Sequence, residues 1–201
     1  MAGFFKRLKK TKQPIIVVSG LPRSGTSMMM RMLEAAGIQP LTDHIRTADS
    51  DNLKGYYEFE RVKKLKEGDV AWLSDAQGKA VKIIAALLIE LPSNYEYHVL
   101  FMRRKMEEIL ASQNKMLENR GESSTVEDDK MAELFRKHLE QVEKWMTEQS
   151  NLRYIDIDYN KMLENPKPQL EEINKFLGSN LNIEKMMEIV DPSLYHQRKQ
   201  L

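Results

Sequence analysis

The chain has 201 residues, of which 41% are hydrophobic and 30% are charged, a composition typical of one soluble globular domain. It contains no cysteine, which excludes a disulfide framework, a thiolate zinc site, an iron–sulfur cluster and a cysteine nucleophile. The formal net charge is only +1, so the overall electrostatics do not favour a nucleic-acid-binding protein, and any anion site has to be local. The lack of cysteine is compatible with a reducing compartment, and we expect a cytoplasmic protein.

Residues 1–13 form a basic tail, which we expect to be separate from a single domain at 14–201. The first twelve residues carry five Lys or Arg and no acid. A solvated tail is the plainest interpretation, and the alternative is a weak contact with an anionic membrane surface or a partner. The apolar runs of the chain are too short for a secretory signal or a membrane span.

The first predicted element is a strand at 15–18, where four β-branched residues stand between Pro14 and Gly20. Such a run is typical of a strand that is buried on both faces of a parallel sheet. Good helix formers follow over 25–37 and end at Gly37, which predicts a helix. The chain therefore begins with a strand, a glycine-bounded loop and a helix.

Further short apolar runs predict three more strands, and longer periodic segments predict four more helices. The strands are expected at 80–84, 98–102 and 153–157, the helices at 106–119, 131–146, 168–177 and 183–190, and loops with short helix at 41–68. This alternation indicates an α/β fold, a three-layer domain with a central, mainly parallel sheet of about four or five strands flanked by helices. The glycine-bounded loop at 20–27, between the first strand and the first helix, makes this domain one of the P-loop type.

The segment 20–27, Gly-Leu-Pro-Arg-Ser-Gly-Thr-Ser, has the outline of a phosphate-binding loop. Its two glycines stand where the backbone must turn so that N–H groups converge on an anion at a helix N-terminus. Nucleoside triphosphatases with such a loop carry a Lys after the second glycine, and Thr26 occupies that position here. The cation of the loop is Arg23, whose guanidinium can bind a sulfonate or a phosphate through two hydrogen bonds.

This loop resembles that of the sulfotransferases, in which Pro-Lys/Arg-Ser-Gly-Thr-Ser/Thr follows a hydrophobic strand. The variant at 22–27 is most similar to the loop of bacterial sulfotransferases and tyrosyl-protein sulfotransferases. The resemblance implies that the loop binds the 5′-phosphosulfate of 3′-phosphoadenosine 5′-phosphosulfate (PAPS), the sulfuryl donor. The implied binding residues are Arg23, Ser24, Gly25, Thr26 and Ser27.

A second part of the sequence carries the same resemblance. The family binds the 3′-phosphate of the donor with an Arg at a strand end and a Ser eight residues later, and Arg104 and Ser112 keep this spacing. A guanidinium at the carboxyl end of a strand and a hydroxyl in the next helix can close on one phosphate, although Arg103 could share the task. Residues 154–178 resemble the late segment of the family, and we interpret them as packing and capping residues.

Lys82 and Glu58 are the candidate catalytic residues besides Arg23. The family places a Lys beside the reacting group, and a charged residue such as Lys82 inside an apolar run needs a partner, unless it faces solvent on an edge strand. Cytosolic members carry a His two residues after that Lys, where this chain has Ile84. Other members use a Glu after the first helix, and the stretch 52–60 resembles theirs. Glu58 is thus the first candidate base, Glu60 the second, and His44 the alternative imidazole.

The expected function is a PAPS-dependent sulfotransferase that needs no metal and acts on a hydroxyl or amine of a small molecule, glycan or peptide. The C-terminal Gly-rich motif of the family is absent, and Arg198 is a candidate replacement cation. One alternative is a non-catalytic PAPS-binding or nucleotide-binding module, which Ile84 makes plausible. The other is a P-loop phosphotransferase, which Thr26 disfavours.

Overall fold

The structure is a computed structural model that describes residues 13–43, 57–178 and 180–190. The basic tail and the candidates His44 and Arg198 lie outside these residues, so those expectations stay predictions. In the described ranges, no helix is long and apolar enough to cross a membrane.

Four parallel strands form one sheet in the order β2-β1-β3-β4. All six residues of β1 are buried, because this strand is central and has helices on both of its faces. The register aligns Gly20 of β1 with Met102 of β3, and Met102 with Ile157 of β4, so these strands end at the same edge. The expected α/β fold with a parallel sheet is confirmed. The bounds are β1 Ile15–Gly20, β2 Ala80–Lys82, β3 Tyr97–Arg103 and β4 Leu152–Asp158.

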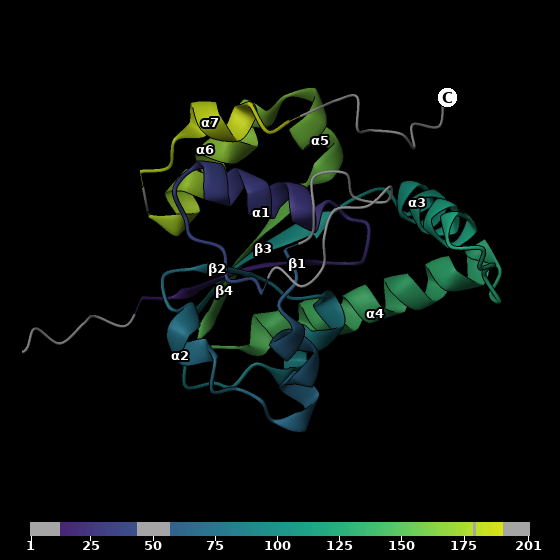
Figure 1. The fold of residues 1–201 in the computed structure, drawn as a ribbon, viewed down its shortest axis with the longest axis horizontal. Helices are drawn as coiled ribbons and strands as arrows, with labels where there is room; N and C mark the ends of the chain where they lie inside the picture. The colour runs from purple at the N-terminus through teal and green to yellow at the C-terminus, as the bar shows by residue number, and fades with distance from the viewer. Residues whose placement is uncertain (1–12, 44–56, 179, 191–201) are drawn as a thin grey trace, which may run out of the picture.

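Helices cover both faces of the sheet and make the three layers (Figure 1). One face carries α1 Thr26–Ala35, α5 Tyr159–Glu164, α6 Pro166–Leu177 and α7 Ile183–Met187. The other carries α2 Leu73–Ala76, α4 Asp128–Glu148 and two 3₁₀ helices, η1 Glu60–Glu67 and η2 Ala85–Glu90.

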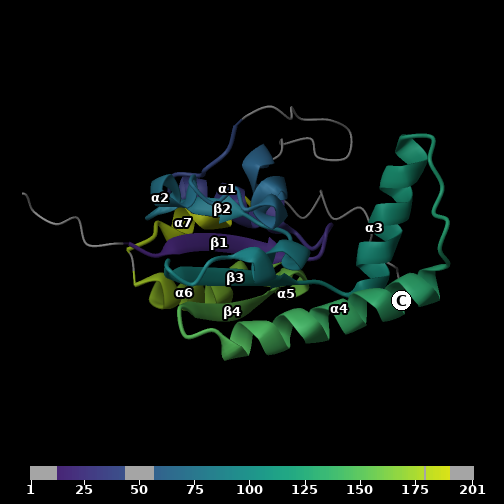
Figure 2. The same cartoon turned by 90° about the horizontal axis from the view of Figure 1, so that it is seen from below.

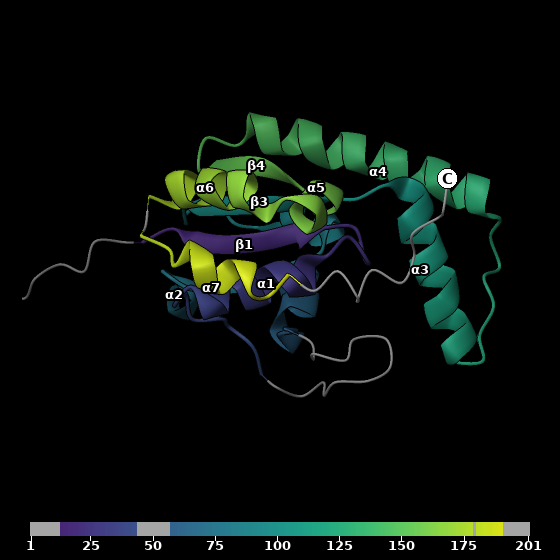
Figure 3. The same ribbon diagram turned by 90° about the horizontal axis from the view of Figure 1, so that it is seen from above.

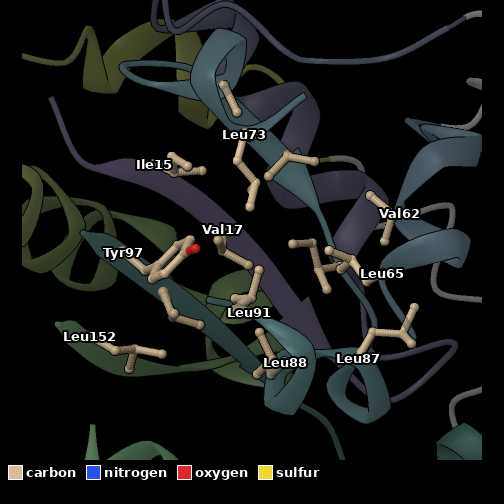
Figure 4. Packing of buried hydrophobic residues seen from close by; sticks show 14 of the residues in the cluster. Ile15, Val17, Val62, Leu65, Leu73, Leu87, Leu88, Leu91, Tyr97 and Leu152 are labelled. Atoms are coloured by element: carbon tan, nitrogen blue, oxygen red, sulfur yellow. The ribbon is translucent and has the colours of Figure 1, made fainter. Parts of the chain in front are cut away.

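Two apolar clusters fill the spaces between the layers. Figure 4 shows the cluster under η1, η2 and α4, in which Val17 of β1 lies near Leu91 and Tyr97. The second cluster lies under α1 and includes four buried methionines of that helix, whose flexible side chains adapt to an irregular space. These methionines are Met28, Met29, Met30 and Met32. Because both clusters are closely packed against the sheet, the loops at its carboxyl edge are attached to a rigid part of the domain.

The helix α3, Met106–Asn119, follows β3 and lies beyond the carboxyl ends of the strands (Figures 2 and 3). From there α4 runs back along the sheet. The start of α3 therefore lies at the same edge as the β1–α1 loop.

Several predicted boundaries differ from those in the structure. The strand expected at 80–84 ends at Lys82, because the apolar residues that follow pack on the core as η2 instead of extending the sheet. The helix expected from 168 begins at Pro166, since proline is tolerated in a first helical turn, and α7 ends at Met187. The short helix α5 was not predicted. Asp158 caps its N-terminus, because its carboxylate accepts hydrogen bonds from the backbone N–H groups of Asn160 and Lys161.

Candidate functional site

The β1–α1 loop uses left-handed backbone at two positions, one on each side of Ser24. Gly25 has φ +100°, and a Cβ there would lie 2.3 Å from Cδ2 of Tyr159. Arg23 has φ +68°, which is uncommon for a residue other than glycine. A Cβ at Gly20 would lie 2.7 Å from the carbonyl oxygen of Met102, so the loop also closes tightly on β3. Alternating backbone of this kind turns successive N–H groups toward one point, where an anion can bind.

The helix α1 begins at this loop with open hydrogen-bonding capacity. No side chain among the described residues caps its N-terminus at Gly25. Ser24 is fully buried in the loop, and its Oγ has no hydrogen-bond partner in the described part of the chain. Thr26 and Ser27 form the partly exposed first turn. A loop with an unsatisfied buried hydroxyl beside an uncapped helix N-terminus fits an anionic group such as a phosphate or a sulfonate.

The side chain of Arg23 leaves the loop and reaches α3. Its Nε donates a hydrogen bond of 2.9 Å to Oγ of Ser112. The carbonyl oxygen of Arg23 accepts a hydrogen bond of 2.9 Å from Nη1 of Arg104. The structure therefore brings together Arg23, Arg104 and Ser112, which the sequence placed in two separate motifs.

The guanidinium of Arg104 lies between α3 and the loop. Its Nε donates to Oε2 of Glu108 at 3.0 Å, and both side chains are nearly buried. Its carbon Cζ lies 4.7 Å from the ring centre of Tyr159, a cation–π contact. Arg103 points elsewhere, because its guanidinium pairs with Asp156 and Glu143 on β4 and α4.

Tyr159 connects the loop with Arg104, so the interpretation of residues 154–178 as packing residues alone was incomplete. Its ring packs on Gly25 on one side and faces the guanidinium of Arg104. Burial raises the pKa of its phenol, while the positive charges of Arg104, Arg31 and Arg23 act in the opposite direction. The phenol is thus neutral, in a region with several cations.

Lys82 and Glu58 lie together at the end of β2. The Nζ of Lys82 is 3.8 Å from Oε1 of Glu58, and the two side chains are 10% and 24% exposed. The alternative that Lys82 faces solvent is therefore wrong, although β2 is an edge strand of the sheet.

The backbone of Glu58 is held by the segment that follows α1. Its carbonyl oxygen accepts a hydrogen bond of 2.9 Å from Oγ1 of Thr42. The neighbouring Tyr57 donates its hydroxyl to Glu34 of α1, and burial together with this hydrogen bond raises the pKa of the Tyr57 phenol. The carboxylate of Glu60 instead pairs with Lys63 on η1 at 2.7 Å. The geometry therefore favours Glu58 over Glu60 as the carboxylate beside Lys82.

Two polar residues of this edge were missed in the sequence. Glu108 stands four positions after Arg104, the spacing of a helical ion pair, and this signal could have found it. Asn160, whose Nδ2 donates to Glu108 at 2.9 Å, gives no such signal because it lies 52 residues away. Among the described residues, no group of three or more His, Asp or Glu side chains is arranged to hold a metal ion.

Together, these features define an α/β domain with a candidate anion-binding edge, built from the β1–α1 loop and the start of α3. Residues 13–201 match the family described as "Sulfotransferase domain". The chain therefore belongs to the sulfotransferase domain family. No curated protein matches the sequence at a significant level.

Solved sulfotransferase structures share the fold at low sequence identity. Sulfotransferase STF1 from Mycobacterium tuberculosis H37Rv has a TM-score of 0.59 and 17% identity over 90% of this chain and 71% of its own. The sulfotransferase domain of the Synechococcus PCC 7002 olefin synthase has a TM-score of 0.55 and 14% identity over 94% and 85%. Mouse sulfotransferase SULT7A1, solved in complex with PAP, has a TM-score of 0.51 and 18% identity over 90% and 63%. These similarities show the fold alone.

Proposed function

We propose that this chain transfers the sulfuryl group of PAPS to a hydroxyl or amine acceptor by in-line displacement. Membership of the family supports sulfuryl transfer in general, and the PAP complex of a structural neighbour supports this donor. The observation that carries the proposal is the joining of the two anion-binding motifs. Arg23 donates to Ser112, and Arg104 donates to the carbonyl oxygen of Arg23.

The loop is proposed to bind the sulfonate and the 5′-phosphate of the donor. The N–H groups and hydroxyls of Thr26 and Ser27, the guanidinium of Arg23 and the buried hydroxyl of Ser24 supply donors of the right kind. Arg104 and Ser112 are proposed to bind the 3′-phosphate. The donor carries phosphates on the 3′ and 5′ oxygens of one ribose, so its site needs neighbouring donors for both, and the hydrogen bond from Arg23 to Ser112 supports such an arrangement.

Lys82 and Glu58 are the proposed catalytic residues, one for stabilising charge and the other for accepting a proton. PAPS, when bound, supplies a sulfuryl group whose transfer leaves negative charge on the oxygen of the nucleotide. The ammonium of Lys82 can stabilise that charge, and the carboxylate of Glu58 can accept the proton of the attacking hydroxyl or amine. Their separation of 3.8 Å lets both act on one reacting centre.

The test is a transfer screen with labelled PAPS across phenols, sugars, tyrosine peptides and amines. Glu58→Gln should lower kcat about 100-fold, because general-base catalysis contributes a factor of this order, while the Kd for PAP changes little. Arg23→Ala should weaken PAP binding. The variant Glu60→Gln separates the two candidate bases.

Each alternative predicts its own result in this test. Full turnover in Glu58→Gln would refute the assignment of the base. Tight PAP binding without transfer to any acceptor would support a non-catalytic nucleotide-binding module. Stabilisation by ATP with Mg²⁺ but not by PAP, read as a rise of Tm, would support a phosphotransferase.

A further inference from the structure

Glu108 is a buried carboxylate to which the proposed mechanism gives no role. It lies on the first turns of α3 with only 6% of its surface exposed. Removing a carboxylate from water is costly unless partners surround it closely. Glu108 has such partners on two sides, and one of them is Arg104.

The contacts of Arg104 fix the orientation of its guanidinium. Nε donates to Glu108 at 3.0 Å, and Nη1 donates to the carbonyl oxygen of Arg23 at 2.9 Å. The carbon Cζ of the guanidinium lies over the ring of Tyr159, 4.7 Å from its centre. Because a guanidinium is planar, two hydrogen bonds from different nitrogens and a contact with an aromatic ring leave it little freedom to rotate.

Asn160 holds Glu108 through its other carboxylate oxygen. Its Nδ2 donates to Oε1 of Glu108 at 2.9 Å, while its Oδ1 accepts from the backbone N–H of Lys105 at 3.4 Å. Asn160 is itself buried and belongs to α5. The carboxylate is therefore fixed by an element other than its own helix, and Arg104 is fixed through it.

We propose that Glu108 is a positioning residue that orients Arg104 for the 3′-phosphate of the donor nucleotide, and that Asn160 holds Glu108 in place. This inference rests on the proposed function. Glu108 has two opposite effects on phosphate binding. Its negative charge weakens the attraction of Arg104 for an anion, whereas its hydrogen bond pre-orders the guanidinium. The ordering effect of Glu108 on phosphate binding is the larger of the two.

The test compares the Kd of adenosine 3′,5′-bisphosphate (PAP) with that of adenosine 5′-monophosphate (AMP), measured by calorimetry. These nucleotides differ only in the 3′-phosphate, so their Kd ratio reports on that group and not on general stability. Glu108→Gln should lower the preference for PAP about tenfold, the size expected for losing a charge-assisted hydrogen bond, and leave the Kd of AMP within about twofold. Asn160→Ala should lower the preference about threefold, because the ion pair with Arg104 remains.

Glu107→Gln is the matched control, since this exposed neighbour loses the same charge on the same helical turn. It should keep the wild-type preference. An unchanged preference in Glu108→Gln, or tighter PAP binding, would overturn the inference, because the carboxylate would then only neutralise Arg104. If Glu108→Gln does not fold, an unchanged preference in Asn160→Ala overturns it instead. A wild-type protein with no preference for PAP would contradict the proposed 3′-phosphate site, a result distinct from the variant outcomes.

Discussion

Gly25 is the position where the structure predicts the sharpest effect of a single added methyl group. The substitution Gly25→Ala places a Cβ 2.3 Å from Cδ2 and 2.8 Å from Cε2 of Tyr159. The ring cannot move away easily, because it is buried and the guanidinium carbon of Arg104 lies over it. Gly25 also has φ +100°, a conformation that alanine adopts only with strain.

The two contributions can be separated with a second glycine. The strain of a positive φ costs about 1–2 kcal/mol for alanine, and overpacking a buried site costs about 1–3 kcal/mol more. Gly37 has φ +94°, and an added Cβ there meets nothing within 4 Å. Gly37→Ala therefore carries the strain alone, so Gly25→Ala should be less stable than Gly37→Ala by about 1–3 kcal/mol.

The assay is urea denaturation, from which the free energy of unfolding of each variant is obtained. A double-mutant cycle adds Tyr159→Ala, which removes the ring that the new methyl group meets. In that background Gly25→Ala should cost no more than Gly37→Ala. Equal losses for the two glycine variants in the presence of the tyrosine would refute the packing of Tyr159 against the loop.

Further predictions concern catalysis, discrimination and pH. Lys82→Met should lower kcat about 100-fold or more with little change in the Kd for PAP. Lys66→Met, at an exposed position, should keep the wild-type kcat. Equal kcat values for the two variants would exclude Lys82 from the chemistry. Arg104→Ala should raise the Kd for PAP at least about tenfold relative to the Kd for AMP. Arg103→Ala should keep the wild-type preference for PAP over AMP, and calorimetry measures the Kd values of both variants. Burial lowers the pKa of His98, so below about pH 6.5 the unfolded chain binds a proton more readily than the folded chain, and stability falls as the pH drops from about 7 to 5. His98→Gln should lose less stability over this range in urea melts, and an equal loss would contradict the assignment.

The sequence predicted the sheet and the main helices because their signals are local. The β-branched run of β1 and the helix formers of α1 need no distant contact to be recognised. The end of β2 was harder to predict, because the residues after Lys82 are apolar enough for a strand, and only their packing under α4 makes them a 3₁₀ helix. Helix α5 is too short for a periodic signal, and a single Asp158 cap starts it.

In the candidate site, too, local sequence patterns could be predicted and contacts between distant residues could not. The spacing of Arg104 and Ser112 is a local pattern, whereas the hydrogen bond from Arg23 to Ser112 spans 89 residues and depends on the left-handed backbone at Arg23. The pairing of Lys82 with Glu58 is also a product of tertiary structure. The sequence supplied candidates for these positions, but it could not show which of them touch.

A crystal structure of the chain with PAP tests the central claim most directly. The proposed function predicts the 5′-phosphate at the N-terminus of α1, within hydrogen-bond distance of the N–H groups of Thr26 and Ser27. It predicts the 3′-phosphate in contact with Arg104 and Ser112. PAP bound away from this edge, or bound in the reverse direction with its 3′-phosphate in the loop, would contradict the proposed donor site.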